Sequence, residues 1–338
     1  METLPTGKVP PELLASLLAR HAPSGAPDVV LGPGVGLDAA AVRVGTEIVV
    51  IKSDPITFAT EEIGWYAVHV NANDVACLGA TPRWFLATLL LPEGRTDEAL
   101  VEEIFAQVHR ACQSLDVALV GGHSEVTHGL ERPLLAGHMV GTVPTDRLIL
   151  PTRARPGDRV LLVRGFPVEG TAIIARERAD ELRRRGYDEA TINEARDYLH
   201  APGISVVEAA GILTRTGPVH ALHDPTEGGV ATGLVELALA TGLGIEVSAA
   251  ALSPLPLGRR LCAEFGLDPL GTIASGALLA AVPPEAVEDH VGALEAAGIP
   301  ARVVGRLLPE GAGYWLRSEG GRRPLPRFEA DEIVRLFE

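Results

Sequence analysis

Two patterns alternate along this whole sequence: short apolar stretches of strand-like composition, and longer stretches with helical spacing. Short links separate them, which is typical of chains that fold into layers of helices and strands. The first half predicts helices at 11–20, 60–78 and 96–114 and strands at 39–44, 47–53, 83–91, 117–120 and 133–143. The second half predicts helices at 169–182, 188–198, 204–215, 228–241 and 284–298 and strands at 218–222, 244–248, 276–282, 301–307 and 313–317. The predicted fold class is α/β (α+β), and the strand order stays open.

The chain is long enough for two domains. Its 338 residues exceed one typical core, and 46% of them are apolar, which is ample material for two cores. The segment TDRLILPTRARPGD at 145–158 combines prolines with turn residues, and RVLLVRG starts a new strand after it. We expect an N-terminal domain at 1–150 and a C-terminal domain at 151–338.

Composition favours a cytoplasmic protein. The longest apolar runs, such as FLATLLL at 85–91, are far shorter than the roughly 18 residues of a membrane span, and METLPTGKVPPELL lacks the pattern of a signal peptide. The three cysteines are scattered and form no CxxC, which favours reduced thiols. The formal charge of −15 disfavours nucleic acid as a partner. We therefore expect neither a membrane nor a nucleic-acid partner.

The second expected helix carries Asn71, Asn73 and Asp74 among apolar residues. Asn and Asp are poor helix formers, and burying them unpaired is costly. Asp38 precedes one expected strand, and Asp54 ends the next, in front of a proline turn. Three carboxylates in a partly dry cleft would repel each other unless a cation lay between them, and oxygen ligands suit Mg²⁺ bound with a polyphosphate. The alternatives are separate caps and turns, or a satisfied polar core.

Two glycine-rich stretches fit the same hypothesis. GPGVG contains Gly34 and Gly36, and GGHS contains Gly121 and Gly122. We expect both to be loops at strand edges, where backbone N–H groups can hold phosphate oxygens. Neither has the spacing of a Walker A loop or of a dinucleotide fingerprint. Simple turns are the alternative for both.

A third polar segment, HDPTEGG at 223–229, lies between an expected strand and an expected helix. The helix N-terminus would attract an anion, with Thr226 and Gly228 beside it, although Thr226 could equally be a simple N-cap. Asp224 and Glu227 would repel an anion, and they better suit a magnesium ion, a substrate amine or proton transfer. The histidines of the chain show neither HxxxH nor HExxH spacing, which disfavours a zinc site.

Taken together, the motifs GVGLDAAAV, KSDPI, VNANDVACLGATPRWF, GGHSEV and HDPTEGGV resemble those of the AIR synthase (PurM-like) superfamily. The match extends from about residue 28 to 327, and the SGALLAAV and GGRRPLPR segments look most like the hydrogenase maturation factor HypE branch. The resemblance implies two α/β domains, a homodimer formed through the N-terminal sheet, and ATP bound with Mg²⁺. It implies metal ligation by Asp38, Asp54 and Asp74, with support from Asn71 and Asn73. It also implies that GGHS lies beside the phosphates and HDPTEGG across the cleft.

The sequence departs from this family pattern in three places. Leu37 stands where members commonly have a second acidic residue, and His123 stands where an Asp or Glu often follows the paired glycines. Lys52 could compensate as a phosphate contact, or could be an exposed strand lysine. HypE ends in a cysteine that carries the carbamoyl group, whereas here Phe328 follows the matching LPR and no cysteine follows it. A chain without that thiol cannot form a thiocarbamate on its own tail.

These features predict an ATP- and Mg²⁺-dependent enzyme that transfers a phosphoryl group to an oxygen of a small, carboxamide-like substrate. His123, Asp224 and Glu227 are candidates for orienting the nucleophile. Partners would be a small-molecule substrate or a maturation partner protein. The alternatives are a small-molecule kinase resembling thiamine-monophosphate kinase, and a nucleotide-binding scaffold with reduced catalysis.

Overall fold

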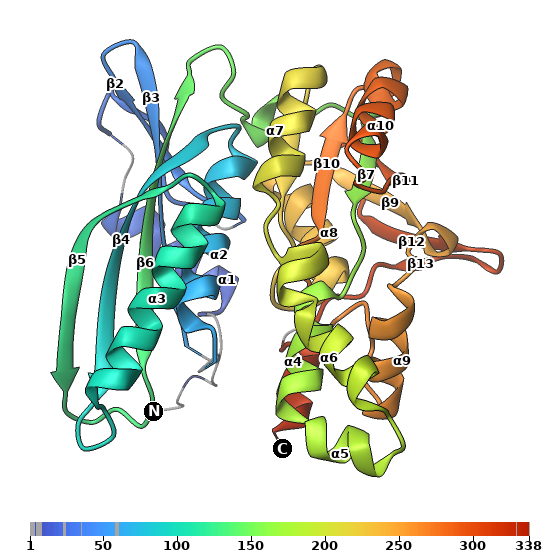
Figure 1. Ribbon diagram of the computed structural model, residues 1–338. Helices are drawn as coiled ribbons and strands as arrows, with labels where there is room; N and C mark the ends of the chain where they lie inside the picture. The colour runs from blue at the N-terminus through green and yellow to red at the C-terminus, as the bar shows by residue number, and fades with distance from the viewer. Residues whose placement is uncertain are drawn as a thin grey trace. The chain divides into compact units, whose positions relative to one another are not determined.

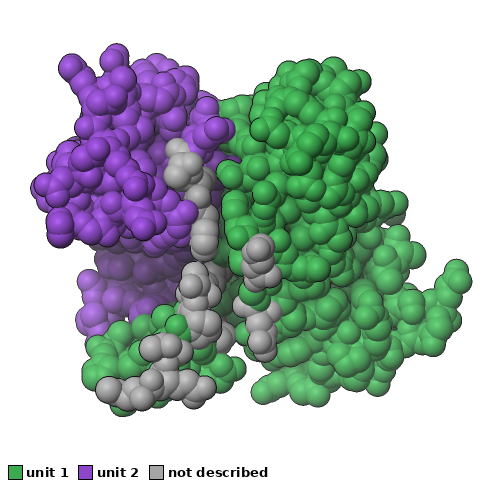
Figure 2. Space-filling model, turned by 90° about the horizontal axis from the view of Figure 1, so that it is seen from below, with its two compact units in different colours: residues 1–23, 34–36, 149–338 green, residues 24–33, 37–148 purple. Residues whose placement is uncertain are grey.

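Two β-sheets with their own helices form the framework of the protein (Figure 1). The computed structural model describes residues 4, 9–22, 25–34, 36–57, 61–328 and 330–337. Contacts divide the chain into two compact units, which Figure 2 colours separately. Unit 2 contains residues 24–33 and 37–148, and unit 1 contains residues 1–23, 34–36 and 149–338. The first helix, α1 (Pro11–His21), therefore groups with the second half of the chain.

Unit 2 is built on a six-stranded sheet in the order β1-β2-β3-β6-β4-β5. All neighbouring strands are antiparallel except β4 and β5, which are parallel. The strands are β1 (Val29–Leu31), β2 (Ala40–Val44), β3 (Glu47–Ile56), β4 (Thr81–Pro92), β5 (Ala118–Thr127) and β6 (Leu134–Pro144). Two helices, α2 (Ile63–Cys77) and α3 (Glu98–Ser114), pack against each other, and α2 lies against β3, β4 and β6 (Figure 1).

Helix α2 approaches the sheet closely because two glycines of β6 make room for it. A Cβ atom at Gly137 would lie 2.5 Å from Asn71 Nδ2, and one at Gly141 would lie 2.5 Å from Val75 Cγ1. The two glycines are four residues apart on the helix-facing side of β6, and Asn71 and Val75 are four apart on α2. The sheet therefore offers a bare groove to one face of the helix, and the polar middle of α2 comes close to the neighbouring strand β3.

Unit 1 is built on a seven-stranded sheet in the order β13-β12-β9-β11-β7-β10-β8, in which only β9 and β12 run parallel. Its strands are β7 (Arg159–Val163), β8 (Ala221–His223), β9 (Gly244–Ser248), β10 (Leu278–Val282), β11 (Ala301–Leu308), β12 (Tyr314–Ser318) and β13 (Gly321–Pro324). Its later helices are α4 (Val168–Glu177), α5 (Ala179–Arg184), α6 (Glu189–Asp197), α7 (Val207–Thr216), α8 (Gly229–Thr241), α9 (Pro256–Glu264) and α10 (Val287–Ala296). Helix α8 is apolar nearly all round, because it packs in the main core of this unit.

The C-terminal segment folds back into unit 1 as a part of its cores. Leu325 joins the cluster around α8, and Ile333 and Leu336 join a second cluster formed with α4, α6 and α9. These last two residues lie on a 3₁₀ helix, Glu332–Leu336. The segment that follows β13 is thus anchored by apolar side chains at both of its ends.

Most predicted elements are confirmed, and three predictions about local structure are wrong. VALV is not a buried strand followed by a GGHS loop: β5 runs through this whole stretch, and residues 118–126 are exposed at the edge of the sheet. Asp54 does not end its strand, since β3 continues through Pro55 to Ile56. A proline fits there because β2 pairs with β3 only as far as Ile51, so one side of the strand is free. The turn predicted after Asp54 is therefore absent.

No helix in the described parts of the chain combines the length and apolarity needed to cross a membrane. Helix α9 was not predicted from the sequence, because PLGRRLCAE has only a short apolar stripe interrupted by two arginines. Proline at its first turn and the buried Leu257, Leu261 and Cys262 account for it.

Candidate functional site

One lysine joins two of the predicted metal ligands in unit 2. Lys52 and Asp54 lie two residues apart on β3, so both side chains face α2, and Asp74 reaches them from that helix. Lys52 Nζ lies 2.8 Å from Asp74 Oδ2 and 3.3 Å from Asp54 Oδ2. The side chain of Asp74 is only 8% exposed and that of Lys52 is 19% exposed, which places the pair at the inner end of the cluster. Lys52 is therefore not the exposed strand lysine that was the alternative prediction.

Asn71 fixes the separation of α2 and β3. Its Nδ2 atom donates hydrogen bonds to the Ala67 carbonyl at 2.8 Å and to the Asp54 carbonyl at 3.2 Å. Its Oδ1 atom is buried and accepts no hydrogen bond from the residues that the structure describes. Asn73 is also fully buried. Asn71 and Asp74 thus face the sheet, and Asn71 brings one uncommitted oxygen to this region.

The carboxylates make the electrostatic potential of the cluster negative, and the Lys52 ammonium is the positive charge among them. Burial alone would lower the pKa of Lys52, but the carboxylates of Asp74 and Asp54, with a smaller contribution from Asp38, raise it above its ordinary value. The lysine stays charged at any working pH as a result. Asp38, Asp54 and Asp74 therefore share one electrostatic environment within unit 2, although they are distant in sequence.

This donor set fits a magnesium ion. Carboxylate and amide oxygens are the ligands that Mg²⁺ takes in proteins, and three aspartates with the uncommitted Asn71 Oδ1 supply them. Lys52 already balances part of their charge, so the cluster is stable without a divalent ion. Three carboxylates and one ammonium leave a net charge of −2, which a divalent cation would balance.

The paired glycines and His123 lie on β5. Phe85 of β4 faces α2, and Thr88 lies three residues further along that strand, so its side chain faces away from α2. His123 pairs in register with Thr88, so it also faces away from α2 and from the Lys52 cluster. His123 is exposed, and its Nε2 atom lies 3.0 Å from Glu125 Oε2. Gly122 has a positive φ of 147°, and a Cβ atom there would overlap the Ala87 carbonyl oxygen. The close approach of β4 therefore explains why a glycine is needed here, and a phosphate contact is not required to explain it.

Gly34 and Gly36 group with unit 1 and not with the aspartates of unit 2. Gly36 has a positive φ of 78°, which favours glycine, and a Cβ atom there would lie 3.5 Å from the Glu236 carbonyl oxygen of α8. A backbone requirement therefore explains Gly36 on its own.

The segment 223–229 forms a tight loop before α8 in unit 1. Thr226 does not cap the helix: the N-cap is Gly228, with a positive φ of 78° and no side-chain cap. The Gly228 N–H instead donates to Asp331 Oδ2 at 2.7 Å. Asp224 is 2% exposed and Glu227 is exposed. The anion position expected at this helix N-terminus is thus taken by a carboxylate of the chain itself.

Asp331 is a residue that sequence reasoning missed. Its two carboxylate oxygens accept hydrogen bonds from the backbone N–H groups of Gly228 at 2.7 Å, Ile333 at 2.8 Å and Ile273 at 3.1 Å. Burial raises the pKa of Asp331 to about 6, although these three hydrogen bonds lower it. A single Asp in a polar tail gives no signal in the sequence. Its partners become evident only when the tail is placed.

A second missed residue is Glu169, in the first turn of α4. It is 6% exposed, and its Oε2 atom accepts no hydrogen bond from the described part of the chain. Burial raises the pKa of Glu169 to about 8, the Ser275 hydroxyl opposes the shift, and the charges of Glu227 and Asp331 add to it. The carboxyl is therefore largely protonated at neutral pH. A glutamate flanked by apolar residues, in FPVEGTAII, was the available signal.

Glu169 should make the stability of the protein depend on pH in a defined direction. Its pKa is raised from 4.5 to about 8, so across this range the folded chain holds a proton that the unfolded chain has released. The stability due to neutral Glu169 is fully present below pH 4.5 and is lost as the pH rises through 8. We expect Glu169→Gln to melt progressively higher, relative to the natural chain, as the pH rises from 5 to 9.

Melting temperatures across that pH range test this, with Glu98→Gln as the control because Glu98 is exposed in the first turn of α3. A difference between Glu169→Gln and the natural chain that stayed constant from pH 5 to 9 would contradict the protonation of Glu169.

Comparisons with known proteins place this geometry in a family. The family model for the N-terminal domain of AIR synthase related proteins matches residues 36–143, and the model for their C-terminal domain matches residues 155–315. The chain belongs to the AIR synthase related family. The resemblance seen in the sequence motifs and the two-domain α/β fold class are thereby confirmed.

The family relatives include hydrogenase maturation proteins. A putative hydrogenase expression/formation protein of Methanocaldococcus jannaschii is 27% identical over 341 residues, which cover 98% of this chain and 97% of the relative. The carbamoyl dehydratase HypE of Rhodobacter capsulatus is 31% identical over 288 residues, which cover 83% of this chain and 81% of the relative. Within the AIR synthase related family, the chain thus falls in the HypE branch.

Solved structures of related proteins share the fold of this chain. HypE in complex with ATP superposes with a TM-score of 0.70 at 26% identity, covering 98% of this chain and 97% of the other. Thiamine monophosphate kinase from Aquifex aeolicus shares the fold, with a TM-score of 0.67 at 22% identity over 92% of this chain and 97% of the kinase.

Proposed function

We propose that this chain is an ATP- and Mg²⁺-dependent enzyme of the HypE branch, which activates the oxygen of a carboxamide group by phosphoryl transfer. The observation that carries the proposal is the Lys52–Asp54–Asp74 cluster, a charged, partly buried group within the domain that matches the AIR synthase N-terminal model. The relationship to a HypE that was crystallised with ATP supports the choice of nucleotide.

Each residue of the cluster has a part in this chemistry. Asp38, Asp54 and Asp74 would hold Mg²⁺, which supplies charge neutralisation at the triphosphate when it is bound. Lys52 is positioned to donate to a phosphate oxygen, because an ammonium has three N–H donors and its contacts with Asp74 and Asp54 engage two of them. Asn71 ties α2 to β3 through its hydrogen bond to the Asp54 carbonyl, and its second hydrogen bond, to the Ala67 carbonyl of α2, holds its side chain in place. Phosphoryl transfer needs mainly such positioning and charge stabilisation.

In the reaction, the amide oxygen attacks the γ-phosphorus of ATP and the bond to ADP breaks. The phosphorylated oxygen then leaves the carbon as inorganic phosphate. The C–O bond breaks, the amide nitrogen releases its two protons, and a carbon–nitrogen triple bond forms, so the amide loses the elements of water. Of the residues predicted to orient the nucleophile, Asp224 and Glu227 stay in this proposal. His123 has less support, since it lies on the sheet face away from Lys52.

A nucleotide-binding scaffold is the second candidate, and one observation favours it. Lys52 already neutralises part of the charge on Asp54 and Asp74, so the cluster does not require a metal ion to be stable. A chain that binds ATP through Lys52 without turning it over would show the same geometry. The fold shared with thiamine monophosphate kinase fits a kinase activity as well, but no side-chain geometry favours it.

Release of ADP by the purified protein separates these candidates. We expect ADP formation that depends on Mg²⁺ and rises when a carboxamide donor, such as carbamoyl phosphate or a peptide with a carbamoylated cysteine, is added. Tight ATP binding with no ADP formed with either donor would favour the scaffold. ADP formation that rises with thiamine monophosphate and not with the carboxamides would favour the kinase.

We also propose a homodimer formed through the sheet of unit 2, in the cytoplasm. The support is a set of large apolar side chains that are exposed on β3, β4 and β5: Ile51, Trp84, Leu119, Val120 and Val126. Ile51 and Trp84 both pair in register with Val140 of β6, so these two exposed side chains lie close together on the sheet face away from α2, and exposed apolar groups gathered on one face favour an interface. A maturation partner protein is a further proposal, because a structure of a HypE–HypF complex shares this fold.

A further inference from the structure

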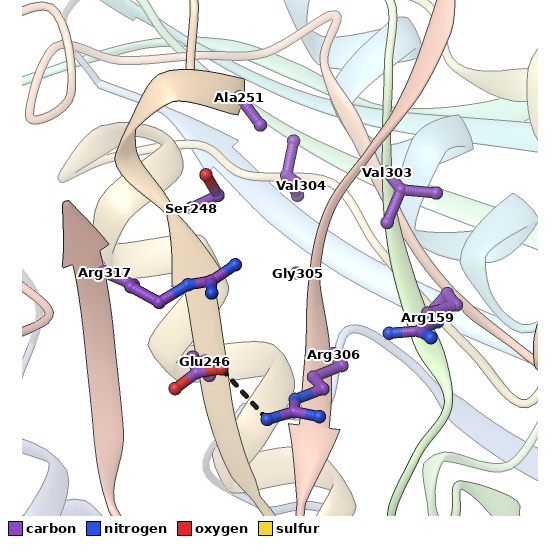
Figure 3. Close-up of a pocket in the computed structure, with 9 residues that line it drawn as sticks. All are labelled: Arg159, Glu246, Ser248, Ala251, Val303, Val304, Gly305, Arg306 and Arg317. Atoms are coloured by element: carbon purple, nitrogen blue, oxygen red, sulfur yellow. Dashed lines mark hydrogen bonds and ion pairs between the residues drawn. The ribbon is translucent and has the colours of Figure 1, made fainter. Parts of the chain in front are cut away.

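A pocket in unit 1 brings together arginines from three strands that the proposed reaction does not use. Arg159 of β7, Arg306 of β11 and Arg317 of β12 line a space of about 350 Å³ (Figure 3). Figure 3 shows Arg159 and Arg317 extending from opposite sides toward Gly305. In a chain with a formal charge of −15, such a concentration of cations on one sheet face requires an explanation.

The strand register places two of these arginines directly opposite each other on neighbouring strands. Arg306 pairs with Arg159 on one side and with Glu246 of β9 on the other. Like charges directly opposite each other on neighbouring strands are destabilising. Glu246 relieves only Arg306, through an ion pair of 3.1 Å. Among the residues that the structure describes, no acidic side chain pairs with Arg159 or Arg317.

The floor of the pocket is bare backbone. The pairing of β11 with β7 shifts register between Val303 and Gly305, and such bulges re-aim side chains at functional positions. A Cβ atom at Gly305 would overlap the Glu246 carbonyl oxygen, so no side chain can stand there. The Ser248 hydroxyl adds a neutral donor at the edge of the space. Two guanidinium groups, one hydroxyl and an unobstructed floor make a receptor for an anion.

We propose that this arginine pocket binds a small molecule through a phosphate group. Arg guanidinium groups match phosphate oxygens in a planar, two-pronged geometry, and two uncompensated arginines match the two charges of a phosphate. A space of about 350 Å³ is in the range of small-ligand sites and is too small for a protein segment with ordered structure. No residue of the proposed ATP site lines the arginine pocket, so the pocket is a distinct site.

Titration calorimetry with inorganic pyrophosphate, in buffer with EDTA and low salt, tests the proposal. We expect one saturable site on the natural chain, at least ten-fold weaker binding in both Arg159→Gln and Arg317→Gln, and a further loss in the double variant. Arg323→Gln, at an exposed position on β13, is the matched control and should bind within two-fold of the natural chain. Inorganic phosphate and a sugar phosphate, titrated in parallel, show whether the free ion or an organic phosphate is preferred.

Three outcomes would overturn the inference. Absence of saturable binding would leave the arginines as solvated surface charges. Binding that is lost in Lys52→Met and kept in both arginine variants would belong to the proposed ATP site. Equal affinity for malonate would assign the pocket to carboxylates instead of phosphates. Melting curves of each variant confirm that the loss of binding is not a loss of fold, and exposed arginines are expected to leave the melting temperature within about 1 °C.

Discussion

Lys52→Met should reduce the formation of ADP by at least about 100-fold, which is the effect of removing one well-placed donor from a charged transition state. Methionine is unbranched and only one atom shorter than lysine, and it removes the charge. Asp74 and Asp54 would then lose the ammonium that lies 2.8 and 3.3 Å from them, and a phosphate would lose a positively charged donor. The measurement is ADP release at saturating ATP and at several Mg²⁺ concentrations.

Two companion variants sharpen this test. Lys52→Arg keeps the positive charge and should retain part of the activity, whereas Arg43→Gln removes an exposed cation from β2 and should leave activity unchanged. A Lys52→Met enzyme that recovered full turnover at high Mg²⁺ would show that the lysine only balances the carboxylates. Because removal of one partner from a buried ion pair is itself destabilising, by about 3–5 kcal/mol in other proteins, the folded fraction must be measured alongside activity.

Asp331→Ala should destabilise unit 1 by at least about 3 kcal/mol, because three backbone N–H groups lose their acceptor together and unsatisfied buried groups cost about 1–3 kcal/mol each. For a unit of this size the melting temperature should fall by at least roughly 6 °C. Burial raises the pKa of Asp331 from its ordinary 3.8 to about 6. The stabilising effect of this carboxyl group is therefore fully present below pH 3.8 and declines as the pH rises through 6. The loss caused by the substitution should accordingly be larger at pH 5 than at pH 8.

Thermal melting at both pH values checks this result. Asp97→Ala is a suitable control, since it removes a carboxylate that accepts one exposed N–H, from Leu100 at 2.9 Å, and should cost about 1 kcal/mol. If Asp331→Ala melted within 1 °C of the natural chain, the tail would not be holding the loop before α8. Such a result would return that helix N-terminus to the set of possible anion sites.

Periodicity alone predicted most helices and strands, because apolar spacing directly reflects which face is buried. It failed at GGHSEVT, where glycine composition favoured a loop and tertiary pairing with β4 made a strand instead. The backbone of Gly122 is required by that pairing, so the glycine is informative about the sheet and not about a phosphate.

The candidate site could be predicted only in part from the sequence. Lys52, Asp54, Asp74 and Asn71 were named because their types and contexts were unusual. Their mutual distances depend on how closely α2 lies to the sheet, and a glycine more than 60 positions later in the chain sets that approach. Asp331 carries no such local signal, since a tertiary contact with residues 103 and 58 positions away gives it its role.

The bare groove of β6 has a consequence for how the enzyme would take up its nucleotide. Gly137 has no side chain, so Asn71 packs directly against the backbone of β6. Asn71 in turn ties α2 to the backbone of β3 through a hydrogen bond. The charged side chains beside it are therefore ordered when the protein folds, and an arriving ligand does not have to immobilise them. Such preorganisation lowers the entropic cost of association, so affinity at this position should depend on the packing of α2 against Gly137, the register partner of Asp54, as much as on the charges themselves.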